Sequence, residues 1–331
     1  MQFVAILPNV FSYMLPETNE DPTPVAQWPS GFDAPDSPSR CLSYNPRTQT
    51  DAIQYAISAG CTGAKADLWL HGSDLLVGSS LATLDEKHTL QSLYLDPLLA
   101  KLKNRPSDNV SPTNPSGLFA DPAQSFVLVL EMKTSSPAAL PMLVSQLNAL
   151  RQHGYLTRIG GRDELVSRPV TIVLTGHKKT VDRPYHDVVF FDSSLDELAL
   201  EDYDQPWKLS HRAQGGVPSA ISSREPHVSQ SHKQSTNAAL FSATANFHDS
   251  IGRPQRGRFS PQQLALIRAQ VQAAHRRGLK ARYYGVPQGR GRLSEYIWRV
   301  LVNEGADLLD VNWEESYRQA WWRRWGTYRP S

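Results

Sequence analysis

The sequence predicts one α/β domain folded as a TIM-type (β/α)₈ barrel, and two observations support this fold class. Segments with strand and helix patterns alternate along the chain, and several strand segments are continuous apolar runs, as in parallel strands buried on both faces. The length of 331 residues suits a single barrel with loop insertions. Because the strands approach eight in number when residues 41–44 are included, a closed barrel is favoured over an open sheet.

The first half of the chain contains the segment with the most informative pattern. Residues 62–70 alternate apolar and polar side chains, which predicts a strand with one polar side. A helix is expected before it at residues 51–58, because Gly60 follows as a C-cap. The other elements expected in this half are a hairpin-like piece at residues 74–79, helices at residues 90–103 and 137–153, and buried strands at residues 126–132 and 170–174.

The second half begins weakly and ends with the most regular alternation of the chain. Short strands are expected at residues 188–191 and 238–241. Helices then alternate with strands, and Gly278 and Gly305 follow the helices as end signals. The elements expected here are helices at residues 261–277 and 293–304 and strands at residues 280–284 and 307–311.

The domain organisation follows from changes in composition. Residues 1–39 are rich in Pro and Asp and are interpreted as a linker or a truncated leader, and the barrel is expected at residues 40–315. Residues 204–237 are polar and cannot bury enough apolar surface to offset their ordering entropy, so we expect a mobile insertion over one barrel face. Residues 316–331 form a Trp/Arg-rich tail.

Composition excludes some classes of function. A net charge of +2 gives no global field that favours nucleic acid, and only the tail hints at an anionic or interfacial partner. The apolar start at residues 3–15 is shorter than the ~20 residues of a membrane helix, so no transmembrane segment is expected. Cys41 and Cys61 cannot make a disulfide framework and fit no metal-ligand spacing, and Cys61 is interpreted as a buried thiol. The compartment and the oligomeric state stay open.

Two pairs of charged residues mark a candidate site. Lys65 and Asp67 share one side of a strand, and Glu131 and Lys133 share one side of the next buried strand, near its end. In a barrel of this type such residues meet at the mouth formed by the strand C-termini. Ion pairs that plug the mouth are one explanation. The other is phosphodiester cleavage, which needs a cation near the phosphate oxygens, a base and an acid.

Longer motifs carry a resemblance to a known family. Residues 60–99 resemble the fungal altered inheritance of mitochondria protein 6 family in its pattern G-C-x-G-V-E-A-D-V-W-L, then L-x-V-G-H, then T-x-x-S-L-Y-x-D-P-L. The resemblance continues in LEMKT at residues 130–134, where the family has I/L-D-I-K-T, and in ADLLDV at residues 306–311. It covers roughly residues 44–313. The resemblance implies a phospholipase-C-like phosphodiesterase barrel related to the glycerophosphodiester phosphodiesterases and the sphingomyelinase-D-like enzymes.

The resemblance also implies a site with two histidines, a Glu-x-Asp pair, a further acid and a lysine. Asp67, Glu131 and Lys133 match this set in chemical type, and Asp67 and Glu131 are the metal ligands that it implies. Lys65 stands in place of the metal-binding Glu, and Ser79 in place of a His. The other histidine, from an S-H-N-D-Y motif, has no counterpart, because residues 43–45 read SYN and no histidine precedes His71.

These departures predict an impaired enzyme. The charge of Lys65 beside Asp67 and Glu131 repels a divalent cation, so Mg²⁺ is expected to bind weakly or not at all. Neither Ser79 nor Tyr44 replaces an imidazole, because only histidine titrates unperturbed near neutral pH. The impaired barrel is still expected to have a pocket for a phosphate-bearing or lipid-like small molecule.

Two alternatives stay open. One is an active phosphoric diester hydrolase, acting on a glycerophosphodiester or a phospholipid, in which Lys65 is the electrophile and His177 or a histidine of the insertion transfers protons. The other is a scaffold that binds lipid or protein without turnover. His177, Tyr284 and Trp313 lie at or past strand ends and are the candidates for a substrate pocket.

Overall fold

The computed structural model describes residues 39–44, 52–104, 117–119, 121, 123–161, 164–176, 187–203, 240–287 and 292–312. The chain divides into two compact units, residues 1–33 and 34–331, and all described residues belong to the second. The predicted linker except its last residue, the predicted insertion and the Trp/Arg-rich tail lie outside the described residues.

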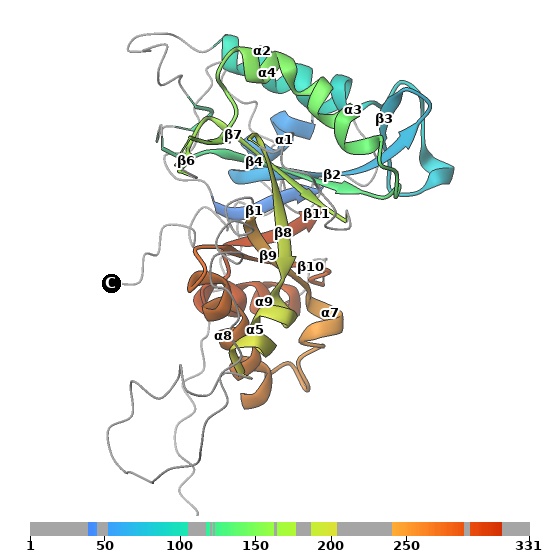
Figure 1. The fold of residues 1–331 in the computed structure, drawn as a ribbon. Helices are drawn as coiled ribbons and strands as arrows, with labels where there is room; N and C mark the ends of the chain where they lie inside the picture. The colour runs from blue at the N-terminus through green and yellow to red at the C-terminus, as the bar shows by residue number, and fades with distance from the viewer. Residues whose placement is uncertain are drawn as a thin grey trace, which may run out of the picture. The chain divides into compact units, whose positions relative to one another are not determined.

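Eight parallel strands form a closed barrel, as predicted (Figure 1). Neighbouring strands pair in the order β1-β11-β10-β9-β8-β7-β4-β2, and β1 also pairs with β2, which closes the ring. The strands are β1 Ser39–Tyr44, β2 Cys61–His71, β4 Phe126–Met132, β7 Val170–Thr175, β8 Val189–Ser194, β9 Leu240–Asn246, β10 Lys280–Tyr284 and β11 Leu308–Asn312.

Apolar side chains fill the barrel below its polar mouth. Six buried residues from five strands, β1, β4, β7, β8 and β11, form one cluster, although these strands lie on different sides of the ring. Alternate residues of a strand point to the same side of the sheet. The inward-pointing residues that follow this cluster along the strands therefore lie at the mouth. The cluster consists of Leu42, Val127, Val129, Val173, Phe190 and Leu308.

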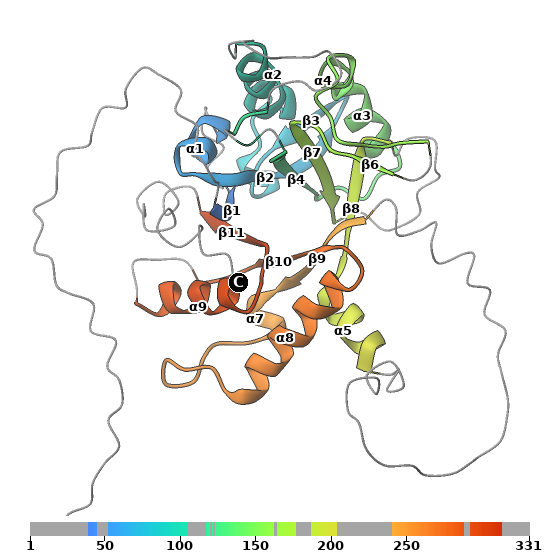
Figure 2. The ribbon, with the colours of Figure 1, turned by 90° about the vertical axis from the view of Figure 1, so that its left-hand side faces the viewer.

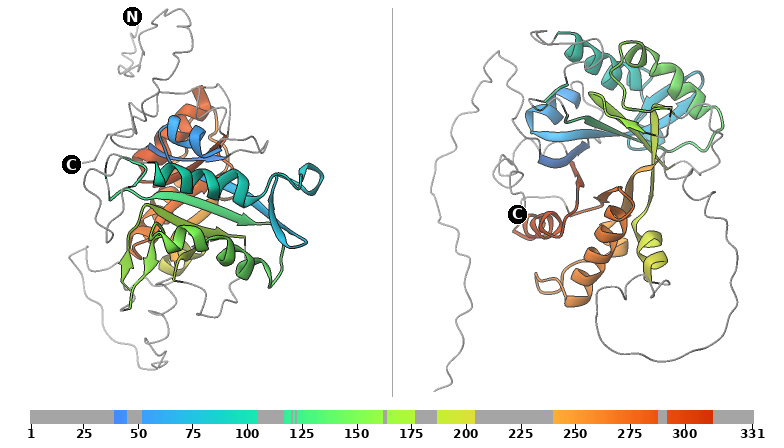
Figure 3. Two further views of the ribbon diagram at one scale, coloured as in Figure 1. Left: turned by 90° about the horizontal axis from the view of Figure 1, so that it is seen from above. Right: turned by 60° about the vertical axis from the view of Figure 1, so that its left-hand side comes forward.

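Helices lie outside the strands and bury a second apolar layer against them (Figures 2 and 3). The helix expected at residues 90–103 begins with a π-helical turn, Gln91–Leu95, and the one expected at 137–153 is divided into two. No helix in the described ranges is long and apolar enough to cross a membrane. The α-helices are α1 Ala52–Ser58, α2 Asp96–Lys103, α3 Ala139–Gln146, α4 Asn148–Gln152, α5 Leu195–Tyr203, α7 Phe247–Ser250, α8 Pro261–His275 and α9 Arg292–Asn303.

Local sequence explains where these elements begin. Helix α8 starts at Pro261 because Ser260 and Gln263 cap each other, with the Ser260 hydroxyl accepting from the Gln263 backbone N–H at 3.1 Å. A short strand β3, Asp74–Val77, runs antiparallel to the end of β2 and extends it beyond the barrel rim. Sequence patterns did not predict the small hairpin of β5, Arg158–Ile159, and β6, Leu165–Val166, or helices α5 and α7.

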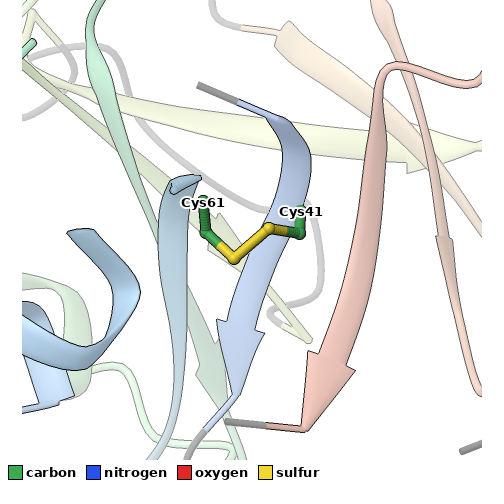
Figure 4. The surroundings of a disulfide bond; sticks show 2 residues. All are labelled: Cys41 and Cys61. Carbon is green, nitrogen blue, oxygen red and sulfur yellow. A yellow bond between two sulfur atoms is a disulfide. The ribbon is translucent and has the colours of Figure 1, made fainter. Parts of the chain in front are cut away.

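A disulfide joins the first two strands, and this corrects the interpretation of Cys61 as a buried thiol (Figure 4). Cys41 of β1 and Cys61 of β2 are both buried, and their Cα atoms are 4.7 Å apart. The parallel pairing of β1 with β2 brings them together, although 20 residues separate them in sequence. Two cysteines make no framework, but they make one covalent link between β1 and β2, the two strands whose pairing closes the ring.

Candidate functional site

Strand register brings the predicted charged residues together at the mouth. Strand β2 pairs with β4 so that Asp67 lies opposite Glu131, and strand β1 pairs with β2 so that Tyr44 lies opposite Lys65. Lys133 follows the end of β4, and its backbone N–H donates to the carbonyl of Leu68 at 2.8 Å. Neighbouring strands therefore present these side chains at one end of the barrel.

The ammonium group of Lys65 lies between the two carboxylates. Its Nζ is 2.9 Å from Asp67 Oδ1 and 2.7 Å from Glu131 Oε2. Lys65 and Asp67 are buried, with 7% and 5% of their surfaces exposed. A buried lysine requires such partners, because removal of its charge from water is costly without them.

Lys133 completes a group of four charges. It forms an ion pair with Glu131, and its Nζ is 3.8 Å from Asp67 Oδ1. Lys133 and Glu131 are partly exposed, so this pair lies nearer to solvent than Lys65 does. The two ammonium groups balance the two carboxylates. We call Lys65, Asp67, Glu131 and Lys133 the lysine–carboxylate quartet.

Tyr44 fixes the far side of Asp67. Its hydroxyl donates to Asp67 Oδ2 at 2.7 Å, and Lys65 Nζ lies 4.4 Å from the centre of its ring. Burial and the charge of Asp67 raise the pKa of Tyr44 far above its ordinary value, so this hydroxyl stays protonated at neutral pH. Tyr44 is thus a hydrogen-bond donor to Asp67, and it cannot serve as a base at neutral pH.

The quartet and Asp310 together keep both Lys65 and Glu131 charged. Burial alone would raise the pKa of Glu131, but Lys65 and Lys133 outweigh it and lower that pKa to about 2. Burial alone would lower the pKa of Lys65, but Asp310, Asp67 and Glu131 outweigh it and raise that pKa. A cationic Lys65 and an anionic Glu131 leave neither group suited to proton transfer at neutral pH.

Sequence patterns missed a second charged group on the opposite strands. Arg282 of β10 is 1% exposed and donates twice to Asp310 of β11, from Nε to Oδ1 at 2.9 Å and from Nη2 to Oδ2 at 2.6 Å. Asp192 of β8 lies 3.9 Å from Arg282 Nη1, and burial raises the pKa of Asp192. A charged residue within each apolar strand was the signal that could have revealed this group.

The remaining predicted residues are placed as follows. Ser79 is exposed, and its hydroxyl lies 3.5 Å from Thr83 Oγ1. The backbone N–H of its neighbour Gly78 donates to the backbone carbonyl of Asp67. Ser79 is therefore the residue after a backbone contact with the quartet. Tyr284 ends β10 and is 37% exposed. His177 and Trp313 lie outside the described residues.

The mouth does not fit the Mg²⁺ ion that the resemblance implies. Mg²⁺ needs an octahedral shell of oxygen ligands, and among the described residues of the β2–β4 side only Asp67 and Glu131 offer carboxylates at the mouth. The Lys65 ammonium already lies within hydrogen-bond distance of both. Across the described ranges, no group of three or more His, Cys, Asp and Glu side chains is arranged to hold a metal ion.

The fold and the matched motifs define the class: a TIM-type barrel of the phosphodiesterase type. A family model described as an AIM6-like phosphodiesterase domain matches residues 32–192, a range that includes Tyr44 and the whole quartet. The chain is 30% identical over 317 residues to an altered inheritance of mitochondria protein 6 homolog of Arthroderma benhamiae, and the match covers 90% of each chain. The chain belongs to the altered inheritance of mitochondria protein 6 family.

More distant relatives agree with this assignment. Altered inheritance of mitochondria protein 6 of Eremothecium gossypii is 25% identical over 284 residues, which cover 83% of this chain and 67% of the relative. The protein of the same name in Saccharomyces cerevisiae is 26% identical over 265 residues, which cover 77% of this chain and 64% of the relative. Both matches cover more than three quarters of this chain.

Proposed function

We propose that this chain is a family barrel without metal-dependent phosphodiester hydrolysis, in which the Lys65 ammonium takes the place of the cation. One observation carries the proposal: Lys65 Nζ lies 2.9 Å and 2.7 Å from the carboxylate oxygens of Asp67 and Glu131. An ammonium there supplies a positive charge between two carboxylates. It cannot activate a water molecule or bridge phosphate oxygens as a divalent ion does.

The proton-transfer groups support the same conclusion. The resemblance implies a histidine at the end of β1, where this chain has Tyr44, and a second one at the position of Ser79. The Tyr44 hydroxyl donates to Asp67, and its raised pKa keeps its proton in place at neutral pH. General acid and base groups contribute roughly 10²–10⁴-fold each, so the loss of both leaves little hydrolysis.

Lys65→Glu and Ser79→His test the proposal in an order that the chemistry dictates. Lys65→Glu adds a third carboxylate beside Asp67 and Glu131, so the variant should be less stable than the parent without Mg²⁺ and should regain melting temperature as Mg²⁺ is added. The parent chain should show no such response. Adding Ser79→His should restore little turnover, because the position of Tyr44 still lacks an imidazole.

The measurements are a Mg²⁺ titration followed by thermal unfolding, and hydrolysis of bis(p-nitrophenyl) phosphate. Lys65→Arg is the matched control, because it keeps the cation and should stay insensitive to Mg²⁺. Hydrolysis by the parent chain that requires Mg²⁺, and that Lys65→Glu lowers, would show that Lys65 is a working catalytic residue. The proposal would then be wrong.

A further inference from the structure

Three exposed arginines lie on the loop that joins α7 to α8, the orange stretch between these helices in Figure 2. They are Arg253, Arg256 and Arg258, and we call them the arginine loop. Within the described ranges, none of their side chains has an ion-pair or hydrogen-bond partner. The loop follows β9 and α7 and leads into the start of α8, so it lies at the same end of the barrel as the mouth.

Arg256 has a backbone conformation that few side chains adopt. Its φ is +50°, and Gly257 after it has a φ of +73°. The backbone N–H of Arg258 donates to the carbonyl of Gln255 at 3.0 Å, which closes a tight turn. Asn, Asp and Gly are the usual residues at the first central position of such a turn, because a larger side chain there is strained. A strained position that carries a long cation indicates a use for that cation at the tip of the turn.

Three helices hold the arginine loop in place. The side-chain NH₂ of Gln263 in α8 donates to the backbone carbonyl of Arg253 at 3.3 Å. After the turn, Phe259 is buried against Phe247 of α7 and Tyr296 of α9, with ring centres 6.1 Å and 5.7 Å apart. Because the loop is already anchored, it needs little further ordering when a partner binds.

An exposed leucine lies next to this loop. Leu293, in the first turn of α9, has 40% of its surface exposed. It precedes Tyr296 by three residues, and residues three apart on a helix share a face. Leu293 therefore lies on the face of α9 whose Tyr296 ring contacts Phe259 of the loop. Helix α9 follows β10, so it also begins at the mouth end of the barrel.

We propose that the arginine loop and Leu293 dock the mouth end of the barrel on a membrane surface that contains anionic phospholipid. Guanidinium groups suit the phosphate groups of such a surface, and a leucine is stabilised at the boundary of the acyl chains. A nucleic acid offers the same phosphates but no apolar layer for Leu293, and the net charge of +2 gives no field that favours it. The proposal goes beyond the proposed loss of hydrolysis, because it concerns different residues and no reaction.

Sedimentation of the whole chain with lipid vesicles tests the proposal. Mixed vesicles of phosphatidylserine and phosphatidylcholine should bind the parent chain at low salt at least tenfold more tightly than vesicles of phosphatidylcholine alone, since each arginine near an anionic surface contributes roughly fivefold. High salt should weaken this binding, because it screens the charges. The Trp/Arg-rich tail carries positive charge as well, so variants are needed to locate the surface.

Neutral variants remove the charge of the turn. Arg256→Gln combined with Arg258→Gln should weaken binding to the mixed vesicles roughly 25-fold at low salt, about fivefold for each arginine. Arg158→Gln combined with Lys103→Gln is the matched control. Both control residues are exposed and have no side-chain partner in the described ranges, and they lie at the opposite end of the barrel, before β7 and at the end of α2. The control should bind as the parent does.

Leu293→Ser tests the apolar contact. It should weaken binding by a similar factor at low and high salt, because salt does not screen the burial of apolar surface. Leu165→Ser is the matched control, since Leu165 is an exposed leucine of β6, which precedes β7 at the opposite end of the barrel. Equal binding to both kinds of vesicle, no binding to either, or a loss in the controls as large as in the test variants would overturn the proposal. Binding of duplex DNA that depends on the arginine loop, without binding of vesicles, would overturn it too.

Discussion

The two sides of the barrel mouth solve the problem of buried charge in different ways. On the β2–β4 side, Lys65 and Lys133 balance Asp67 and Glu131, so the quartet is neutral. On the β8–β11 side, one guanidinium faces two carboxyl groups, and a hollow lined by two more carboxylates lies next to it. The first side therefore balances its charges within itself, whereas the second has more carboxyl groups than cations among the described residues.

The strongest test of this comparison removes one cation from each side. Arg282→Met removes the guanidinium that donates twice to Asp310 and approaches Asp192, so it should lower the free energy of unfolding by roughly 3–5 kcal/mol. Lys65→Met should cost less, because Lys133 still contacts both carboxylates of the quartet. Urea unfolding of both variants measures the difference. A larger loss for Lys65→Met would reverse the comparison.

Strand β1 lies between the two sides of the barrel mouth. Removal of its disulfide tests whether this strand holds the two sides together. Cys41 ties β1 to β2, while hydrogen bonds pair the same strand with β11. Cys41→Ala combined with Cys61→Ala should lower the free energy of unfolding by about 3 kcal/mol, as expected for a loop of this length. The parent chain with a reducing agent is the control. Equal stability in all three samples would show that the ring closes without this link.

These residues also show how much of the structure could be predicted from the sequence. The strands and helices were predictable because apolar periodicity is local, and the quartet was predictable because each pair lies two residues apart on one strand. Arg282 and Asp310 were missed, since 28 residues separate them and only the barrel register brings them together. The same holds for Cys41 and Cys61. The hollow collects residues from the ends of three strands, which no local pattern reveals.

The pH dependence of stability sharpens the description of the neutral side. The pKa of Glu131 is lowered from 4.5 to about 2, so its ionised form stabilises the fold at pH values above 4.5. This contribution should disappear as the pH falls from 4.5 through 2, and it amounts to roughly 2–3 kcal/mol once partial exposure is allowed for. Unfolding measured across this range gives its size.

Two variants isolate the Glu131 contribution. Glu131→Gln should flatten the loss of stability between pH 4.5 and 2, because the variant has no carboxylate to protonate at this position. Glu304→Gln is the control, since it removes a carboxylate that pairs with Arg268 outside the barrel mouth. An unchanged slope in Glu131→Gln would mean that Lys65 and Lys133 do not stabilise this carboxylate.

The smallest effect is expected when residues 204–237 are replaced by a short linker. Residues 204–237 connect α5, which carries Asp196, to β9, which carries Thr244, and both elements form the hollow. Their polar composition predicts that a short Gly/Ser bridge can replace them with little change in melting temperature, because loop closure costs only about 0.6 kcal/mol per doubling of length. Thermal unfolding of the deletion variant checks this expectation, with a scrambled 204–237 sequence as the length-matched control. A large drop in melting temperature in both the deletion variant and the scrambled control would contradict this expectation. It would mean that the native sequence of residues 204–237 stabilises the fold.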